Sequence, residues 1–212
     1  MMKKTLLILA AALSGVLAAG AQTGREWQDP AVNEINRLPM RASYFAYESA
    51  EAARKGDPRV SERFLDLDGT WKFSWVCTFD IPASWGGKDI FLSIGSATSN
   101  VYVWVNGRFV GYSEDSKLAA QFDITKFVKP GENLIALQMF RWSDGTYLED
   151  QDFWRFAGIA RGVELTARDK AHLEDVRITP VLDSEYKDAT LRVEVETTPR
   201  VKSVGLTLRD AA

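Results

Sequence analysis

The stretch RWSDGTYLEDQDFWRF, residues 141–156, holds the side chains of this sequence best suited to chemistry. Four carboxylates fall close together there, interleaved with aromatic residues: Asp144, Glu149, Asp150 and Asp152. Gly145 permits a turn among them. Carboxylates on a turn supply the oxygen ligands that hard cations prefer, and aromatic rings beside carboxylates suit sugars. The pattern therefore favours a loop that binds a cation or a sugar.

Catalysis by these carboxylates is a second interpretation. A retaining glycosidase needs two carboxyl groups about 5–5.5 Å apart, and Glu149 with Asp152 could be proposed for this pair from composition alone. The roles also need a cleft that raises one pKa, so we expect binding and not catalysis. Simpler alternatives remain open: a solvated turn for Asp144 and Glu149, and a buried ion pair of Asp152 with Arg141 or Arg155.

Composition excludes several function classes. The 212 residues suffice for one domain and part of a second. A formal net charge of -3 gives no nucleic-acid footprint. The single cysteine, Cys77, allows no intrachain disulfide. The single histidine, His172, argues against a His-rich zinc site, and any Ser-His-Asp triad would have to use it.

The first 21 residues read as a signal peptide. Lys3 and Lys4 precede an apolar run over 5–17, and Ala19-Gly20-Ala21 forms a small-x-small cleavage site. The run is short for a membrane span of about 20 residues, so we expect cleavage near Ala21 and no membrane anchor. The mature protein is then periplasmic or secreted.

From residue 64 onward the sequence alternates as strands do. Apolar residues recur at period two over six stretches: 70–76, 89–94, 100–105, 108–112, 133–141 and 161–167. Asn106-Gly107 is the strongest short hairpin signal, because a type I′ turn needs positive φ twice. Residues 64–168 therefore predict an antiparallel β-sandwich. An extended segment over 22–63 precedes it, with a helix-prone stretch at 48–55 too short to stand alone.

A second β block follows. Its alternating stretches are 175–179, 190–196 and 204–208. Three strands cannot close a sandwich, so residues 172–212 read as the start of a second β domain. The sequence is accordingly expected to be the N-terminal part of a longer protein.

Four long motifs run along the chain in order: EWQDPAVNEINRLPMRA, LDGTWKFSW, NVYVWVNGRFVGYSEDSKL and FDITKFVKPGENLIALQMFRWSDGTYLEDQDFWRFAGIAR. Together they resemble the N-terminal part of the large bacterial β-galactosidases of glycoside hydrolase family 2. The resemblance implies a jelly-roll (galactose-binding-like) sugar-binding domain at 64–168 and a partial immunoglobulin-like sandwich at 172–212. It places the two catalytic glutamates in a barrel absent from this sequence, so the resemblance assigns no catalytic residue here. Family members are often oligomeric, which makes a homo-oligomer a further expectation.

The resemblance also assigns ligands. Asp152 matches a residue that reaches the active site, helps hold a sodium ion and meets the galactosyl 6-hydroxyl. A separate site for a divalent cation, Mg²⁺ or Ca²⁺, matches five positions: Glu26, Asp29, the Val32 carbonyl, Glu114 and Asp144. Three of these differ in type from the best-known member, since Glu26, Asp29 and Glu114 replace an aspartate, an asparagine and a glutamine, and the cluster is more acidic as a result.

One departure from the family concerns the sandwich itself. Family members place some dozens of residues, with further strands and a sugar-contacting asparagine, where Val76 here runs directly into Cys77. A real deletion and a gene-model artefact both explain this. Two further functions stay open beside a β-galactosidase part: a non-catalytic carbohydrate-binding module, and a structural or assembly module.

Overall fold

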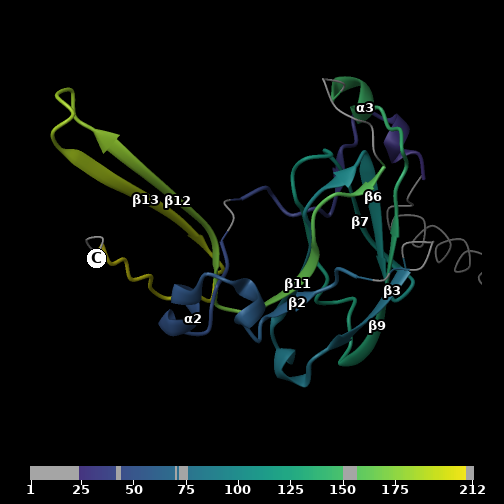
Figure 1. Cartoon of the computed structure of the whole chain (residues 1–212), viewed down its shortest axis with the longest axis horizontal. Coiled ribbons are helices and arrows are strands. Elements are labelled where there is room, and N and C mark those ends of the chain that lie inside the picture. Colours follow the sequence, from purple (N-terminus) through teal and green to yellow (C-terminus); the bar gives the residue numbers. More distant parts are fainter. Residues whose placement is uncertain (1–23, 42–43, 70, 72–75, 150–156, 209–212) are drawn as a thin grey trace, which may run out of the picture.

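The computed structural model describes residues 24–41, 44–69, 71, 76–149 and 157–208. Two antiparallel sheets pack face to face, and a two-stranded ribbon extends away from them (Figure 1). The all-β sandwich predicted from the alternation is confirmed. The five-stranded sheet has the order β1-β7-β6-β9-β3, and the four-stranded sheet has the order β2-β11-β4-β8.

The strands of the five-stranded sheet are β1 (Glu34–Ile35), β3 (Val76–Ile81), β6 (Asn100–Val105), β7 (Arg108–Glu114) and β9 (Gly131–Gln138). Those of the four-stranded sheet are β2 (Phe64–Asp66), β4 (Asp89–Ile94), β8 (Ala120–Asp123) and β11 (Val163–Arg168). A small pair joins β5 (Ala97–Thr98) to β10 (Gly158–Ile159), and the ribbon is β12 (Leu173–Leu182) with β13 (Ala189–Thr197). The helices are α2 (Ala50–Lys55) and α3 (Gly145–Leu148), with 3₁₀ turns at Glu26–Gln28, Pro58–Val60 and Ala83–Trp85.

The core lies between the two sheets and follows from the period-two pattern. On β6, Val101, Val103 and Val105 face inward and are at most 1% exposed. Burying such a side chain fully is worth roughly 1.5–3 kcal/mol. The opposite face of β6 carries Tyr102, which is equally buried because the N-terminal segment covers it.

The predicted hairpin between β6 and β7 is confirmed. Asn106 and Gly107 both have positive φ, 51° and 75°, as a type I′ turn requires. The Asn106 side chain also donates to the Phe127 carbonyl at 2.9 Å and to Asn133 Oδ1 at 2.8 Å. These bonds tie the turn to the neighbouring strand and fix the register of the sheet.

The N-terminal segment, predicted as extended, covers both sheets in turn. It first adds β1 to the edge strand β7, which requires a glycine at position 111 because a Cβ there would meet the Ile35 carbonyl at 2.4 Å. It then crosses to the four-stranded sheet and forms α2. Ser49 caps this short helix at its N-terminus and Gly56, with φ 67°, ends it.

Two predicted strands need comment. The strand expected at 204–208 is wrong: residues 201–208 form no strand, and Leu206 and Leu208 are exposed. Within the described residues no strand lies alongside to complete its hydrogen bonds. The strand expected at 70–76 lies mostly outside the described residues. The ribbon confirms the strands expected at 175–179 and 190–196 and extends both.

In the described part of the chain, no helix is both long and apolar enough to cross a bilayer.

Candidate functional site

The loop after β9 is docked onto the N-terminal segment (Figure 1). The Asp144 N–H donates to the Trp27 carbonyl at 3.0 Å, and the Trp27 ring stacks on Phe140 at 5.1 Å between centroids. The Ser143 N–H donates to Thr146 Oγ1 at 2.9 Å, which starts the single turn α3. At the other end of the turn, Glu149 accepts from the N–H of Ser116 at 3.0 Å and also from its hydroxyl. The described part of the acidic loop, which ends at Glu149, is thus held at both ends.

Two carboxylates lie under this loop on the outer face of the five-stranded sheet. Glu26 is 5% exposed and accepts from the Tyr102 hydroxyl at 2.8 Å. Glu114, 7% exposed at the end of β7, accepts from the Tyr112 hydroxyl. Tyr102 and Tyr112 are cross-strand partners whose ring centroids lie 4.4 Å apart. The pairing of β6 with β7 therefore brings Glu26 and Glu114 close together.

Asp144 adds a third carboxylate to this cluster. Burial raises the pKa of Glu114 to about 7; the Tyr112 hydrogen bond opposes this, while a hydrogen bond with Asp144 and the charges of Asp144 and Glu149 add to it. The Asp144 Oδ1 atom is buried and has no hydrogen-bond partner. Gly145 allows the close approach, because a Cβ there would meet Glu114 Oε2 at 3.1 Å.

A cation fits this donor set. A buried carboxylate oxygen without a donor, next to a glutamate whose pKa is raised by other carboxylates, gains most from a positive ion. As the side chains stand, however, no three His, Cys, Asp or Glu in the described residues are arranged to hold a metal. The cluster is acidic and buried, as a cation site requires, but its side chains do not form a complete coordination shell.

The structure gathers only part of the predicted ligand set. Glu26, Glu114 and Asp144 lie together. Asp29 is exposed; its Oδ1 accepts from the Ala31 N–H at 3.0 Å and its carbonyl from the Val32 N–H at 2.8 Å, so both belong to a local turn. Asp152, Asp150 and Arg155 lie outside the described residues.

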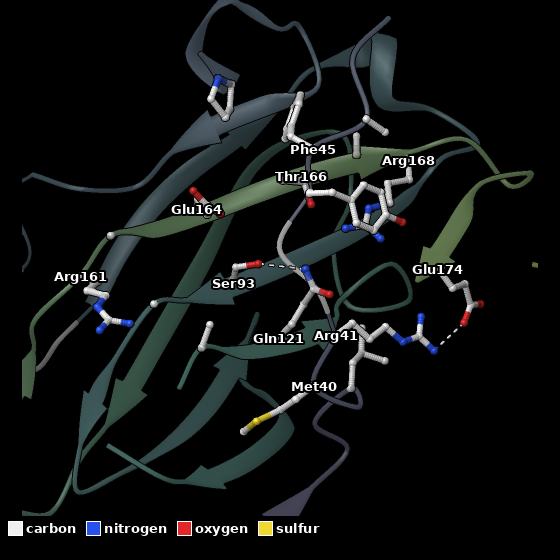
Figure 2. Close-up of a pocket in the computed structure, with 18 of the residues that line it drawn as sticks. Met40, Arg41, Phe45, Ser93, Gln121, Arg161, Glu164, Thr166, Arg168 and Glu174 are labelled. Carbon is white, nitrogen blue, oxygen red and sulfur yellow. Dashed lines mark hydrogen bonds and ion pairs between the residues drawn. The ribbon is translucent and has the colours of Figure 1, made fainter. Parts of the chain in front are cut away.

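A second candidate site went unnoticed in the sequence. A pocket of about 620 Å³ opens on the outer face of the four-stranded sheet, beneath residues 38–41 and 44–47 (Figure 2). Its floor includes Ser93, Gln121, Glu164 and Thr166. The sequence does indicate that these four residues face outward, because the period-two alternation that places apolar residues in the core places them on the opposite face of the sheet.

Comparison with known proteins decides the family. Residues 73–169 match the model described as "Glycosyl hydrolases family 2, sugar binding domain". These residues form a glycosyl hydrolase family 2 sugar-binding domain. The match spans the sandwich from β3 to β11, so the fold and the motif order that suggested this family agree with it.

Curated relatives of this sugar-binding domain are β-galactosidases. The chain is 31% identical to that of Pectobacterium atrosepticum over 236 residues, which is 82% of the chain and 22% of the relative. It is 44% identical to that of Priestia megaterium over 122 residues, 58% of the chain and 12% of the relative. The chain thus spans less than a quarter of the length of these relatives.

The two matches differ in their gaps. In the Pectobacterium match, 82% of the 212 residues is about 174, so about 60 of the 236 matched positions have no counterpart in this chain. In the Priestia match, 58% is about 123 residues, which leaves no such gap. Over the matched region this chain is therefore shorter than the Pectobacterium relative by several dozen residues.

Solved structures with this domain's fold are β-glucuronidases. The enzyme of Ruminococcus gnavus in complex with uronic isofagomine is 26% identical with a TM-score of 0.52, covering 59% of this chain and 24% of that one. A β-glucuronidase of an uncultured Clostridium sp. is 25% identical with a TM-score of 0.52, covering 57% and 23%.

Proposed function

We propose that this domain serves a β-galactosidase that hydrolyses terminal β-D-galactosides, with its catalytic barrel and both catalytic glutamates outside this sequence. The observation that carries the proposal is the 44% identity to the Priestia megaterium β-galactosidase over 122 residues. The β-glucuronidases of similar fold are only 25–26% identical, so the sequence favours galactosides.

Asp152 is the residue we assign to the sugar in the complete enzyme, where it would meet the 6-hydroxyl and help hold a sodium ion. The support is that the turn preceding Asp152 in the sequence is held in place by hydrogen bonds. Hydrogen bonds from Asp144 to Trp27 and from Ser116 to Glu149 hold the preceding turn. Sites held by such secondary contacts keep the geometry that a substrate needs.

A divalent cation, Mg²⁺ or Ca²⁺, is the second expected ligand. Glu26, Glu114 and Asp144 would hold it, with Asp29 and the Val32 carbonyl as the further positions implied by the family. Its contribution is electrostatic: it would neutralise the buried carboxylates and pin the N-terminal segment to the loop. The orphaned Asp144 oxygen and the raised pKa of Glu114 support this.

Export and assembly complete the proposal. Residues 1–21 would direct the chain to the periplasm or the medium and be removed near Ala21, and the complete protein would form a homo-oligomer. The signal peptide lies outside the described residues, so its support is the sequence pattern alone.

The test compares two polypeptides. The 212-residue chain alone should show no hydrolysis of p-nitrophenyl-β-galactoside. A polypeptide read on from Ala212 into a barrel should hydrolyse it in preference to the glucuronide, and Asp152→Asn should lower that rate. Preference for the glucuronide would contradict the assignment, as would turnover by the 212-residue chain.

A further inference from the structure

A row of polar side chains crosses the outer face of the four-stranded sheet. Glu164 on β11 is in register with Asp66 on one side and Ser93 on the other, and Ser93 is in register with Gln121. Registered neighbours on one face lie about 4.5–5.5 Å apart. Gln121 Nε2 donates to Ser93 Oγ at 3.0 Å. The row is therefore a continuous line of donors and acceptors from one edge of the sheet to the other.

The next row along the strands places Thr166 between two aromatic residues, Phe64 and Phe91. Thr166 is 7% exposed, lines the pocket, and its hydroxyl has no hydrogen-bond partner. A buried hydroxyl without a partner lowers stability, and protein interiors leave few such groups. An occupant of the pocket that offers a polar atom would satisfy it.

The N-terminal segment forms the wall opposite these rows, as Figure 2 shows. Tyr44, Phe45 and Tyr47 line the pocket from this segment. The wall is fixed: Tyr44 donates its hydroxyl to the Leu173 carbonyl, and Arg168 lies over the Tyr44 ring at 5.2 Å. About 620 Å³ is within the usual range for small-molecule sites.

Charged side chains of both signs line the pocket: Arg41, Arg161 and Arg168, with Glu164 and Glu174. Arg41 is paired with Glu174 at 2.7 Å, and Arg161 donates to the Lys117 carbonyl at 2.9 Å. Glu164 lies on the floor, and burial followed by the charges of Asp66 and Asp68 raises its pKa. Because the Glu164 carboxylate would repel an anion, a neutral ligand whose hydroxyls donate to it suits this floor better than a phosphate or carboxylate would.

We propose that this pocket binds a neutral saccharide of one or two hexose units. Its hydroxyls would bond to Glu164, Gln121 and Thr166, and the apolar face of a ring would pack on the aromatic wall. This goes beyond the function proposed above, because the pocket lies on the outer face of the sheet opposite to the one that carries Glu114 and the acidic loop.

The test is titration of lactose into the 212-residue chain, followed by NMR chemical shifts. We expect saturable binding that Glu164→Gln weakens about tenfold, which is the loss of a hydrogen bond to a charged group. Thr166→Val should weaken it several-fold, and neither variant should unfold at a lower temperature than the wild type. The matched control Glu132→Gln, an exposed glutamate on β9, should bind as the wild type does.

Three results would overturn the proposal: no saturable binding to the folded wild type, equal binding by the wild type and both pocket variants, or tighter binding of galactose 6-phosphate than of galactose. Loss of binding in Asp152→Asn with retention in Glu164→Gln would also overturn it. That result would leave the function proposed for the acidic loop intact, so the two ideas fail separately.

Discussion

The two outer faces of the sandwich are covered by the same N-terminal segment in different ways. Over the five-stranded sheet the segment packs closely, and Tyr102 and Tyr112 are at most 1% exposed beneath it. Over the four-stranded sheet, residues 38–41 and 44–47 leave a pocket of about 620 Å³. The first face is closed to solvent around Tyr102 and Tyr112, and the second has kept a cavity.

The two faces differ in which buried polar group is left uncompensated. On the closely packed face the imbalance is one of charge, since Glu114 and Asp144 share a buried site and Asp144 Oδ1 has no donor. On the face with the pocket the imbalance is one of hydrogen bonds, since the Thr166 hydroxyl has no partner. A cation relieves the first and a ligand bearing hydroxyls relieves the second.

Divalent cations should produce the largest effect. Mg²⁺ or Ca²⁺ at a hundred times its Kd should raise the free energy of unfolding of the wild type by about 2.7 kcal/mol relative to chelator. Asp144→Asn should abolish most of this gain, because it removes the charge of the carboxylate with the orphaned oxygen. Thermal or urea unfolding with and without the cation measures it.

The control for the cation is Glu132→Gln, which removes an exposed carboxylate from β9 and should respond as the wild type does. An unfolding curve of the wild type that neither Mg²⁺ nor Ca²⁺ shifts would contradict the cation site. The acidic face would then be balanced by protonation of Glu114 alone.

Thr166→Val should stabilise the ligand-free chain by about 1 kcal/mol, since it replaces a buried hydroxyl that has no partner by a methyl group of the same shape. Thr125→Val is the matched comparison. The Thr125 hydroxyl accepts from the Ile90 N–H at 2.9 Å, so its removal should destabilise by a similar amount. Urea unfolding measures both, and a destabilised Thr166→Val would show that this hydroxyl is satisfied.

The smallest effect concerns pH. The pKa of Glu164 is raised from 4.5, first by burial and then by Asp66 and Asp68. The folded state therefore holds its proton more tightly than the unfolded state, and stability falls as pH rises from about 4.5 through the folded pKa. Glu164→Gln should reduce this fall in urea titrations between pH 4 and 8, and the part that remains belongs to Glu114, whose pKa burial raises to about 7. A variant that keeps the full slope would assign the dependence to another group.

Asp169 should produce a pH dependence of stability opposite in sign to that of Glu164. A hydrogen bond from Lys88, with Arg63 assisting, lowers its pKa from 3.8. Its contribution is present above that value and is lost as pH falls through the folded pKa. The two slopes occupy different pH ranges, so Glu164→Gln should leave the acid limb unchanged.

Sequence reasoning succeeded where local pattern decides structure. The period-two alternation located β4, β6 and β7, and Asn106-Gly107 located the turn between the last two. It was wrong at 204–208, because an alternating stretch becomes a strand only when a neighbour offers hydrogen bonds. It also missed the short strand β8, whose four residues carry too little pattern to stand out.

The two candidate sites also differ in how far the sequence could predict them. The clustering of Glu26 and Asp144 could be expected from the family resemblance, although they are far apart in the sequence and meet only through β6 and β7. The pocket could not be expected, because it depends on the distance between the sheet and residues 38–41 and 44–47, which the sequence pattern does not determine. Alternation shows which residues face outward and leaves open what covers them.

The most direct test of two independent ligand sites is a single set of unfolding temperatures, measured with and without Ca²⁺ and with and without lactose. The wild type should be raised by each ligand separately, and by both together by about the sum. Asp144→Asn should lose only the response to Ca²⁺, and Glu164→Gln most of the response to lactose and nothing else. A variant that loses both responses, or a wild type that shows neither, would contradict the account.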